Sequence, residues 1–182
     1  TRRREIAHFD HGAQYVTARS PEFSAYLERA FEAGAADRWA PAGVDKGHRI
    51  WWVGQPGMSG LVKPLAEGLS IHNSVRIETI EPRDDGWALQ ADGDAPESVF
   101  DAVLVTAPVP QTTDLLGGHG AAFANLPEAE LAPCWTVMLA FDAPLPVKSD
   151  LLRDEDQPLA WCARNSYKPG RPGTADAWVL QA

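Results

Sequence analysis

Short apolar segments that end at turn residues are the main constraint on how this chain can fold. The sequence has 15 glycines and 15 prolines among 182 residues, and these residues, together with aspartates, close nearly every apolar run. Asp84-Asp85-Gly86, for example, is a hairpin signal between two strand-like segments. A parallel sheet needs strands that alternate with crossover helices, and the sequence lacks that alternation. The pattern therefore favours an α+β fold with a mainly antiparallel sheet.

One segment has clear helical periodicity. Ser20 can cap a helix, Pro21 suits its first position and Gly34 can end it, and the apolar residues between them recur on one face. A second helix is expected over residues 59–67. It contains Pro64, which should kink it or confine it to a short turn on either side.

Strand-like segments make up most of the remainder. The apolar run at 99–107 is nearly continuous, which is typical of a strand covered on both faces. It is followed by one or two helical turns at 111–116. Strands are expected at 49–53, 71–80, 87–91, 99–107, 134–141, 159–164 and 177–181.

Charge and composition exclude several classes of function. A formal net charge of −9 argues against a nucleic-acid or anionic-membrane partner. No stretch is apolar for long enough to cross a bilayer. Cys134 and Cys162 match no metal or redox spacing and are expected as free thiols in a reducing, cytoplasmic compartment. His8 and His11 lack companion ligands, so no metal site is expected.

The segment from His8 to Arg19 is unusual because polar and aromatic residues surround a single glycine, Gly12. It is too polar for a core strand, and it lacks helical periodicity. In one interpretation Gly12 only turns the chain and Tyr15 packs in the core. In the other, the small residues Gly12 and Ala13 let a ligand approach the backbone closely. The residues alone favour the first interpretation.

Four segments with a characteristic order and spacing are Phe9-Asp-His-Gly-Ala-Gln-Tyr15, Trp52-Val-Gly-Gln-Pro-Gly-Met-Ser59, Phe100-Asp-Ala-Val-Leu-Val-Thr-Ala-Pro-Val-Pro110 and Ala163-Arg-Asn-Ser-Tyr-Lys-Pro-Gly-Arg171. Together they resemble the bacterial renalase-like branch of the flavin-containing amine oxidase superfamily, a group of NAD/FAD-dependent oxidoreductases. The resemblance covers essentially the whole chain. It implies a two-domain FAD enzyme, in which a Rossmann-type domain holds the dinucleotide and a second, mainly antiparallel domain covers the flavin.

The resemblance also implies how the chain is organised. A Gly-x-Gly-x-x-Gly motif would precede Thr1 and a flavin-contacting segment would follow Ala182, since the sequence contains neither. Residues 1–19 would be a flavin-facing loop segment and 71–116 would supply strands of an incomplete FAD-binding domain. Residues 20–70 and 117–182 would belong to the substrate domain, the second as its sheet.

The resemblance assigns cofactor contacts to three parts of the chain. In the N-terminal loop, Gly12 and Ala13 would allow close approach of the flavin, and Gln14 and Tyr15 would contact it. Val75 would offer its backbone to the adenine end, although it suits an ordinary strand core equally well. The dinucleotide would pass Thr106, Ala107 and Pro108. Arg2 and Arg3 could pair with ribose or pyrophosphate oxygens, or they could form a solvated basic end of the chain.

For the substrate side, the resemblance points to Trp52, Arg164 and Asn165, which with Gln14 and Tyr15 form the expected catalytic set. Tryptophan offers a flat wall for a planar ring, and arginine and asparagine offer oriented donors. The alternatives are core packing for Trp52 beside Trp51, and a strand end with a turn cap for Arg164 and Asn165.

The implied function is that of an FAD-dependent oxidoreductase, acting as part of a longer chain. Hydride would pass from a dihydronicotinamide-type or amine substrate to the flavin, with oxygen as the acceptor. The alternative from another class is a non-catalytic binding or scaffold domain without the dinucleotide-binding half.

Overall fold

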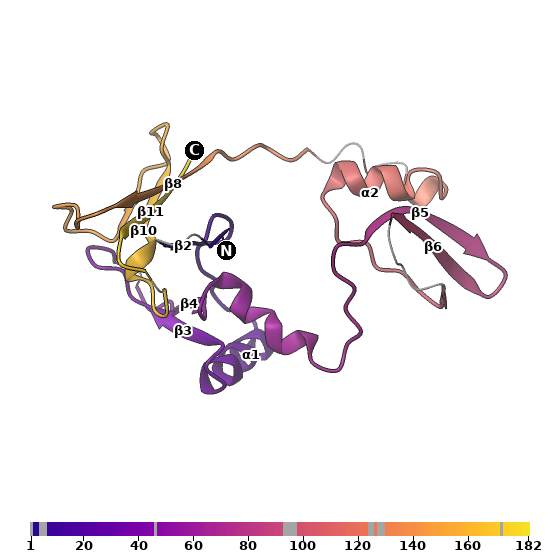
Figure 1. Cartoon of the computed structure of the whole chain (residues 1–182), viewed down its shortest axis with the longest axis horizontal. Helices are drawn as coiled ribbons and strands as arrows, with labels where there is room; N and C mark the ends of the chain where they lie inside the picture. Colours follow the sequence, from indigo (N-terminus) through magenta and orange to yellow (C-terminus); the bar gives the residue numbers. More distant parts are fainter. Residues whose placement is uncertain are drawn as a thin grey trace. The chain divides into compact units, whose positions relative to one another are not determined.

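The computed structural model describes residues 2–3, 7–45, 47–92, 98–123, 126, 130–171 and 173–182. The chain divides into two compact units (Figure 1): unit 1 comprises Thr1–Gly68 and Cys134–Ala182, and unit 2 comprises Leu69–Pro133. Antiparallel strand pairs dominate both units, which confirms the α+β fold class. The assignment of four parts to flavin and substrate domains stays a prediction.

Unit 1 contains a four-stranded antiparallel sheet in the order β8-β11-β10-β9. The central strand β11 is buried from Asp176 to Val179. Three of the strands confirm the sequence prediction, whereas β9 was not expected because three residues are too few to show a period of two. The strands are β8 (Thr136–Phe141), β9 (Leu151–Arg153), β10 (Trp161–Arg164) and β11 (Asp176–Gln181).

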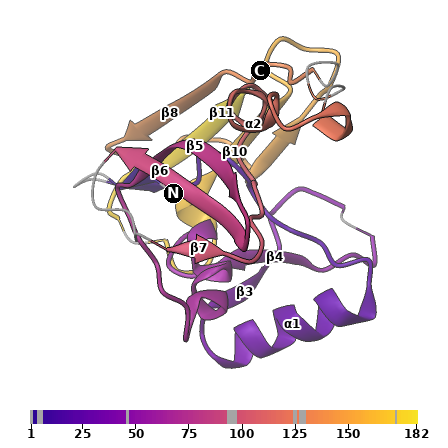
Figure 2. The same ribbon diagram turned by 90° about the vertical axis from the view of Figure 1, so that its right-hand side faces the viewer.

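A second layer of unit 1 consists of helix α1 (Pro21–Glu32) alongside the hairpin of β3 (Ala36–Trp39) and β4 (Trp51–Gly54) (Figure 2). The helix begins as the sequence predicts, because the Ser20 hydroxyl accepts a hydrogen bond from the Phe23 amide at 3.2 Å. Gly34 follows its end with a φ of +70°, which glycine adopts without strain. The strand expected at 49–53 is confirmed as β4.

Pro64 divides the next segment, as the sequence predicts. Two short 3₁₀ helices, η1 (Met58–Leu61) and η2 (Lys63–Ala66), replace a continuous helix. Pro64 lies in the first turn of η2, where its missing N–H leaves no intrahelical bond unmade.

A short ribbon brings the N-terminal residues to the sheet of unit 1. Its strands are β1 (Arg2–Arg3) and β2 (His8–Phe9), and the 3₁₀ helix η5 (Asn165–Tyr167) follows β10. Ala7 and Phe9 pack against Ala177 and Val179 of β11. The segment that follows β2 is therefore anchored beside the sheet.

The described residues of unit 2 form a three-stranded antiparallel sheet, an α-helix and a short 3₁₀ helix. Its elements are β5 (Arg76–Arg83), β6 (Gly86–Asp92), β7 (Val99–Phe100), α2 (Val109–Leu116) and the 3₁₀ helix η3 (Ala121–Phe123). The predicted hairpin at Asp84-Asp85-Gly86 is confirmed. Gly86 has a φ of +151°, and a Cβ there would lie 2.4 Å from the Phe100 carbonyl oxygen, so the turn requires glycine.

Two strand predictions in unit 2 were wrong in extent. The strand expected at 71–80 begins only at Arg76. The strand expected at 99–107 is limited to Val99–Phe100, which pair with Trp87 and Ala88 of β6. Among the described residues no strand pairs with 101–107, and Leu104 is 89% exposed. An apolar run forms a strand only where a neighbour accepts and donates its backbone hydrogen bonds, so composition alone misled the prediction.

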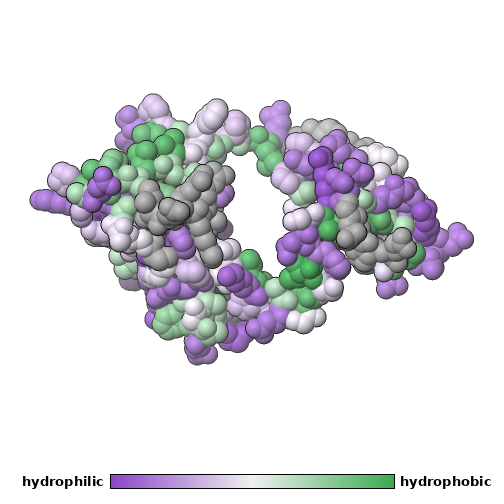
Figure 3. Space-filling model, in the orientation of Figure 1, coloured by the Kyte–Doolittle hydropathy of each residue, from purple (hydrophilic) through white to green (hydrophobic). Residues whose placement is uncertain are grey.

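The visible surface mixes polar and apolar side chains (Figure 3). Exposed apolar residues include Trp135 in unit 1 and Leu104 in unit 2. Within the described ranges, no helix is long and apolar enough to span a membrane.

Candidate functional site

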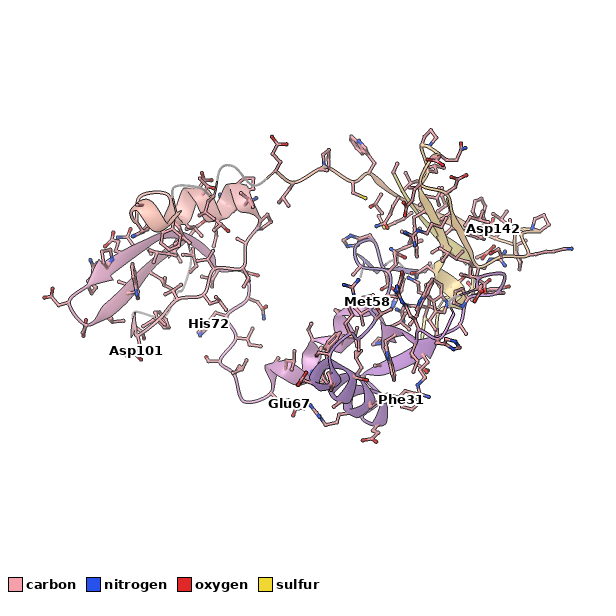
Figure 4. The ribbon with its side chains drawn as sticks, turned by 180° about the vertical axis from the view of Figure 1, so that it is seen from behind. Phe31, Met58, Glu67, His72, Asp101 and Asp142 are labelled. Carbon is pink, nitrogen blue, oxygen red and sulfur yellow. The ribbon has the colours of Figure 1, made fainter. Side chains whose placement is uncertain are left out.

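The loop after β2 is held by a buried carboxylate, Asp10. The Asp10 Oδ2 atom accepts hydrogen bonds from Arg171 Nε at 2.9 Å and Arg171 Nη2 at 2.6 Å. Asp10 Oδ1 accepts from the Met58 amide at 3.0 Å, and Figure 4 labels Met58 on η1. Arg171 also donates to the carbonyl of Gly54, 2.8 Å away, at the end of β4. Asp10 therefore ties the loop to two segments far away in the sequence.

Lys168 and Gln14 extend this network beneath the loop. Lys168 Nζ donates to Gln14 Oε1 at 2.8 Å and lies 3.5 Å from Asp10 Oδ2. The Gln14 amide nitrogen donates to the carbonyls of Asp10 and Gly12, at 3.1 Å for Gly12. The Lys168 ammonium also lies 5.0 Å from the centre of the Trp39 ring, a cation–π distance. Gln14 thus holds the loop backbone and is itself held by Lys168.

Burial determines the electrostatics of Lys168. Desolvation lowers the pKa of Lys168 from 10.5 to about 8, and the neighbouring positive charge of Arg171 acts in the same direction. The carboxylate of Asp10 opposes this shift by Coulomb attraction and a hydrogen bond. The ammonium group therefore titrates much closer to neutral pH than an exposed lysine does.

Above this buried base, the loop presents exposed small residues. Gly12 and Ala13 are exposed, and no described atom lies within 4 Å of the place that a Gly12 Cβ would occupy. Their amides donate no hydrogen bond to any other described residue. Within the described part of the chain, no neighbouring atom requires a glycine at this position.

An aromatic cluster lies at the C-terminal side of the loop. The Tyr15 ring stacks on Trp51, with centroids 4.1 Å apart and planes 9° apart. It also lies 5.7 Å from the Trp161 ring at an angle of 21°, while Trp39 is tilted at 6.3 Å. Within the described ranges, the indole nitrogen of Trp161 is buried without a hydrogen-bond partner. Tyr15 thus packs between aromatic residues of β4 and β10.

Trp52 lies on the other face of β4, away from this cluster. It is 2% exposed and packs with Leu27, Ala30, Ala36 and Leu61 beneath α1. The edge of Phe31, labelled in Figure 4, contacts its ring at 6.0 Å. Successive residues of a strand point to opposite faces, so Trp51 and Trp52 cannot both join one cluster. The geometry favours the core alternative for Trp52, and its substrate role stays a prediction.

Arg164 lies in a separate buried ion-pair cluster of unit 1. Its Nη2 atom donates to Asp176 Oδ2 at 3.1 Å and to the Leu145 carbonyl at 2.7 Å. The guanidinium lies over the rings of Tyr167 and Trp178, at 4.5 Å and 4.9 Å. Burial disfavours the charged form of Asp176, but hydrogen bonds from the Leu145 amide and the Trp178 indole, together with Arg164, outweigh it and lower its pKa. These contacts support a structural role for Arg164.

Asn165, the neighbour of Arg164, belongs to the base of the loop instead. It is fully buried. Its side-chain oxygen accepts from the Asp10 amide at 3.3 Å, and its side-chain nitrogen donates to the His8 carbonyl at 2.7 Å. Asn165 therefore joins the start of η5 to the backbone on either side of Phe9.

The other expected cofactor residues lie in strand β1 and in unit 2. Arg2 and Arg3 pair through their backbones with Phe9 and His8. Val75, Thr106, Ala107 and Pro108 all belong to unit 2. Val75 is partly buried just before β5, and the other three are exposed before α2, where the Ala107 carbonyl accepts from Thr112 Oγ1 at 2.8 Å.

Sequence reasoning missed four residues of the site: Asp10, Trp51, Lys168 and Arg171. Three of them lie inside the quoted segments, and a charged residue within an otherwise small or apolar motif was the available signal. Their pairing could not be read locally, because Asp10 and Arg171 are 161 positions apart. Among the described residues, no group of three or more histidine, cysteine, aspartate or glutamate side chains could hold a metal ion.

The geometry of the loop fits the flavin that the resemblance implies. A flavin ring carries hydrogen-bond acceptors along its edge and needs close approach of backbone donors. Gly12 and Ala13 offer two such amides on an exposed loop whose base is fixed by buried ion pairs. Of the predicted residues, Gly12, Ala13, Gln14, Tyr15 and Asn165 come together here.

Two comparisons with known proteins bear on this site. The model of the family described as flavin containing amine oxidoreductase matches residues 5–181. The fold is similar to the crystal structure of a protein from Exiguobacterium sp. 255-15 that is provisionally named a protoporphyrinogen oxidase, with a TM-score of 0.51 and 21% identity. The match covers 89% of this chain and 36% of that chain. This chain thus spans about a third of the length of that protein, and at this identity the likeness concerns the fold.

Proposed function

Because this chain belongs to the flavin-containing amine oxidoreductase family, we propose that the complete protein is an FAD-dependent oxidoreductase of renalase-like type. The substrate is a dihydronicotinamide-type ring or, in second place, an amine. The observation that carries this proposal is the exposed Gly12–Ala13 loop, whose amides donate to no described residue, on a buried base fixed by ion pairs. A loop that only turned the chain would not need so much buried polar support.

In this proposal the chain's residues bind and orient. The amides of Gly12 and Ala13 would hold the flavin, and Gln14 keeps them in place through its hydrogen bond to the Gly12 carbonyl. Tyr15 supports the loop from the aromatic cluster. Arg2 and Arg3 serve the phosphate or ribose groups, and Val75, Thr106, Ala107 and Pro108 serve the dinucleotide through backbone and small side chains.

A bound flavin would supply the redox chemistry, taking a hydride from the substrate and passing two electrons to oxygen to give peroxide. The protein need not supply an acid or a base for that transfer. The role of the substrate-facing residues is to hold a planar ring, for which the expected group is Trp52, Arg164 and Asn165. All three residues are buried in unit 1, which supports an indirect role, in which they stabilise the fold around the site.

The test is the visible spectrum of the full-length protein. Flavin absorption bands are expected after purification or reconstitution with FAD. Anaerobic mixing with candidate dihydronicotinamides and amines should then bleach the flavin fastest with the true class of substrate. A colourless protein that cannot be reconstituted would overturn the proposal and favour a binding or scaffold role.

Gly12→Ala tests the site itself. No described atom lies within 4 Å of the new Cβ, so the fold should be unchanged while FAD binding weakens by about tenfold or more. Binding is measured by FAD titration, and the thermal midpoint of the apoprotein reports the fold. Equal FAD affinity for the variant and the wild type would remove this loop from the flavin site.

A further inference from the structure

Counted over the described residues, the buried cluster beneath the loop has more positive than negative charge. Asp10 forms ion pairs with both Lys168 and Arg171, and all three side chains are at most 1% exposed. Asp10 and Arg171 are the charged groups that act on Lys168 among the described residues. One carboxylate therefore faces two cations.

Arg171, and not Lys168, is the closer cationic partner of Asp10. Arg171 approaches the Asp10 carboxylate to 2.6 Å and forms two hydrogen bonds with it, whereas Lys168 remains 3.5 Å away. The short contact of Lys168 is with the Gln14 side chain. A buried ammonium costs free energy because it is removed from water, and burial alone therefore does not favour a lysine at this position. The position of Lys168 thus calls for an explanation beyond stability.

We propose that Lys168 is a positioning residue for the flavin: it fixes Gln14 and thereby the Gly12–Ala13 loop, and its positive charge lies behind that loop. The proposal rests on the function proposed above. Positive charge near a flavin ring favours the negative charge that the ring gains on reduction. Lys168 therefore raises the reduction potential of the bound flavin.

The charge of this cluster also depends on pH. Because the pKa of Lys168 lies at about 8, the ammonium group loses its proton just above neutral pH. The cluster then loses one positive charge, while the ion pair of Asp10 with Arg171 remains. The potential of the bound flavin should fall more steeply with pH above 8 than below it.

The experiment compares the full-length, flavin-loaded wild type with Lys168→Met, Lys168→Arg and the exposed Lys63→Met as a control. At pH 7 we expect the reduction equilibrium of Lys168→Met to be about tenfold less favourable, which is about 30 mV for a two-electron couple. Lys168→Arg should keep the wild-type potential and lose the break near pH 8. Lys63→Met should keep both.

A second measurement needs neither bound flavin nor a high yield of the variant. Amide hydrogen exchange at Asp10, whose N–H donates to Asn165, should be several-fold faster in the apoprotein of Lys168→Met than in that of the wild type. The reason is that Gln14, which donates to the Asp10 carbonyl, loses its own partner. If Lys168→Met fails to fold, the break near pH 8 in the wild-type potential decides the question. An unchanged potential in Lys168→Met, or a wild-type potential without that break, overturns the proposal while flavin binding still stands. A wild type that binds no flavin overturns the proposed function instead.

Discussion

At the scale of single residues, Asp10 decides where the N-terminal loop lies. Its carboxylate accepts hydrogen bonds from Arg171 and from the Met58 amide, and its own amide donates a hydrogen bond to the Asn165 side chain. Such a carboxylate is costly to bury and is stabilised only while its partners remain. The loop is therefore rigid at its base although its tip is exposed.

Asp10→Asn should be strongly destabilising. It leaves the cations of Lys168 and Arg171 buried without a carboxylate, which costs about 3–5 kcal/mol in the free energy of unfolding. Urea unfolding measures the loss. Glu28→Gln is the control, because its ion pair with Arg38 is exposed and worth at most about 1 kcal/mol. Equal losses for the two variants would contradict the buried network.

Lys168 should make stability rise with pH in a defined window. Its pKa is about 8 in the folded chain against an ordinary value of 10.5, so between these values the unfolded chain binds more protons. Stability then increases with pH, by up to about 1.4 kcal/mol per pH unit. The free energy of unfolding of the wild type relative to Lys168→Met should rise from about pH 8 to 10.5. The absence of a rise over that range, with a fall above pH 10.5, would mean that Asp10 holds Lys168 protonated.

At the scale of elements, strand β4 serves two clusters at once. Trp51 contributes to the aromatic cluster with Tyr15, and Trp52 contributes to the core beneath α1. Met58 packs against both clusters. The strand thus couples the wall of the site to the helix layer of unit 1.

Trp52→Ala should unfold unit 1 rather than change a binding surface. Removing a ring that is 2% exposed costs about 3–5 kcal/mol. Trp135→Ala is a matched control, because that ring is 80% exposed and its loss should cost within about 0.5 kcal/mol. Thermal unfolding followed by circular dichroism separates the two. A stable Trp52→Ala variant would restore a substrate-facing role for this residue.

At the scale of the whole molecule, unit 1 is assembled from two distant parts of the sequence. Residues 1–68 supply the loop and α1, and residues 134–182 supply the four-stranded sheet. The ion pairs of Asp10 with Lys168 and Arg171 join these parts. The site therefore requires both segments of unit 1.

Limited proteolysis should cut first between the units. Residues 69–74 and 130–133 are exposed and have no helix or strand. Such segments are the preferred sites of proteolytic nicking. Mass spectrometry should therefore find early fragments that end in these two ranges, and first cuts inside β8 or β11 would contradict the division into units.

The sequence by itself determined the features that depend on near neighbours. Capping residues located α1, Pro64 divided η1 from η2, and Asp84-Asp85-Gly86 located the hairpin of unit 2. The short, turn-bounded segments gave the antiparallel fold class, because local periodicity and turn chemistry are encoded within a few residues. The segment around Gly12 could be recognised as a candidate ligand loop.

Only the tertiary structure decided which of these residues meet. It paired Asp10 with Arg171, placed Trp51 rather than Trp52 beside Tyr15, and left 101–107 without a described strand partner. Whether a charge can be buried, or a strand can form, depends on partners that arrive from distant parts of the chain. The residues near a given position in the sequence do not identify those partners, so burial and pairing are determined by the tertiary structure.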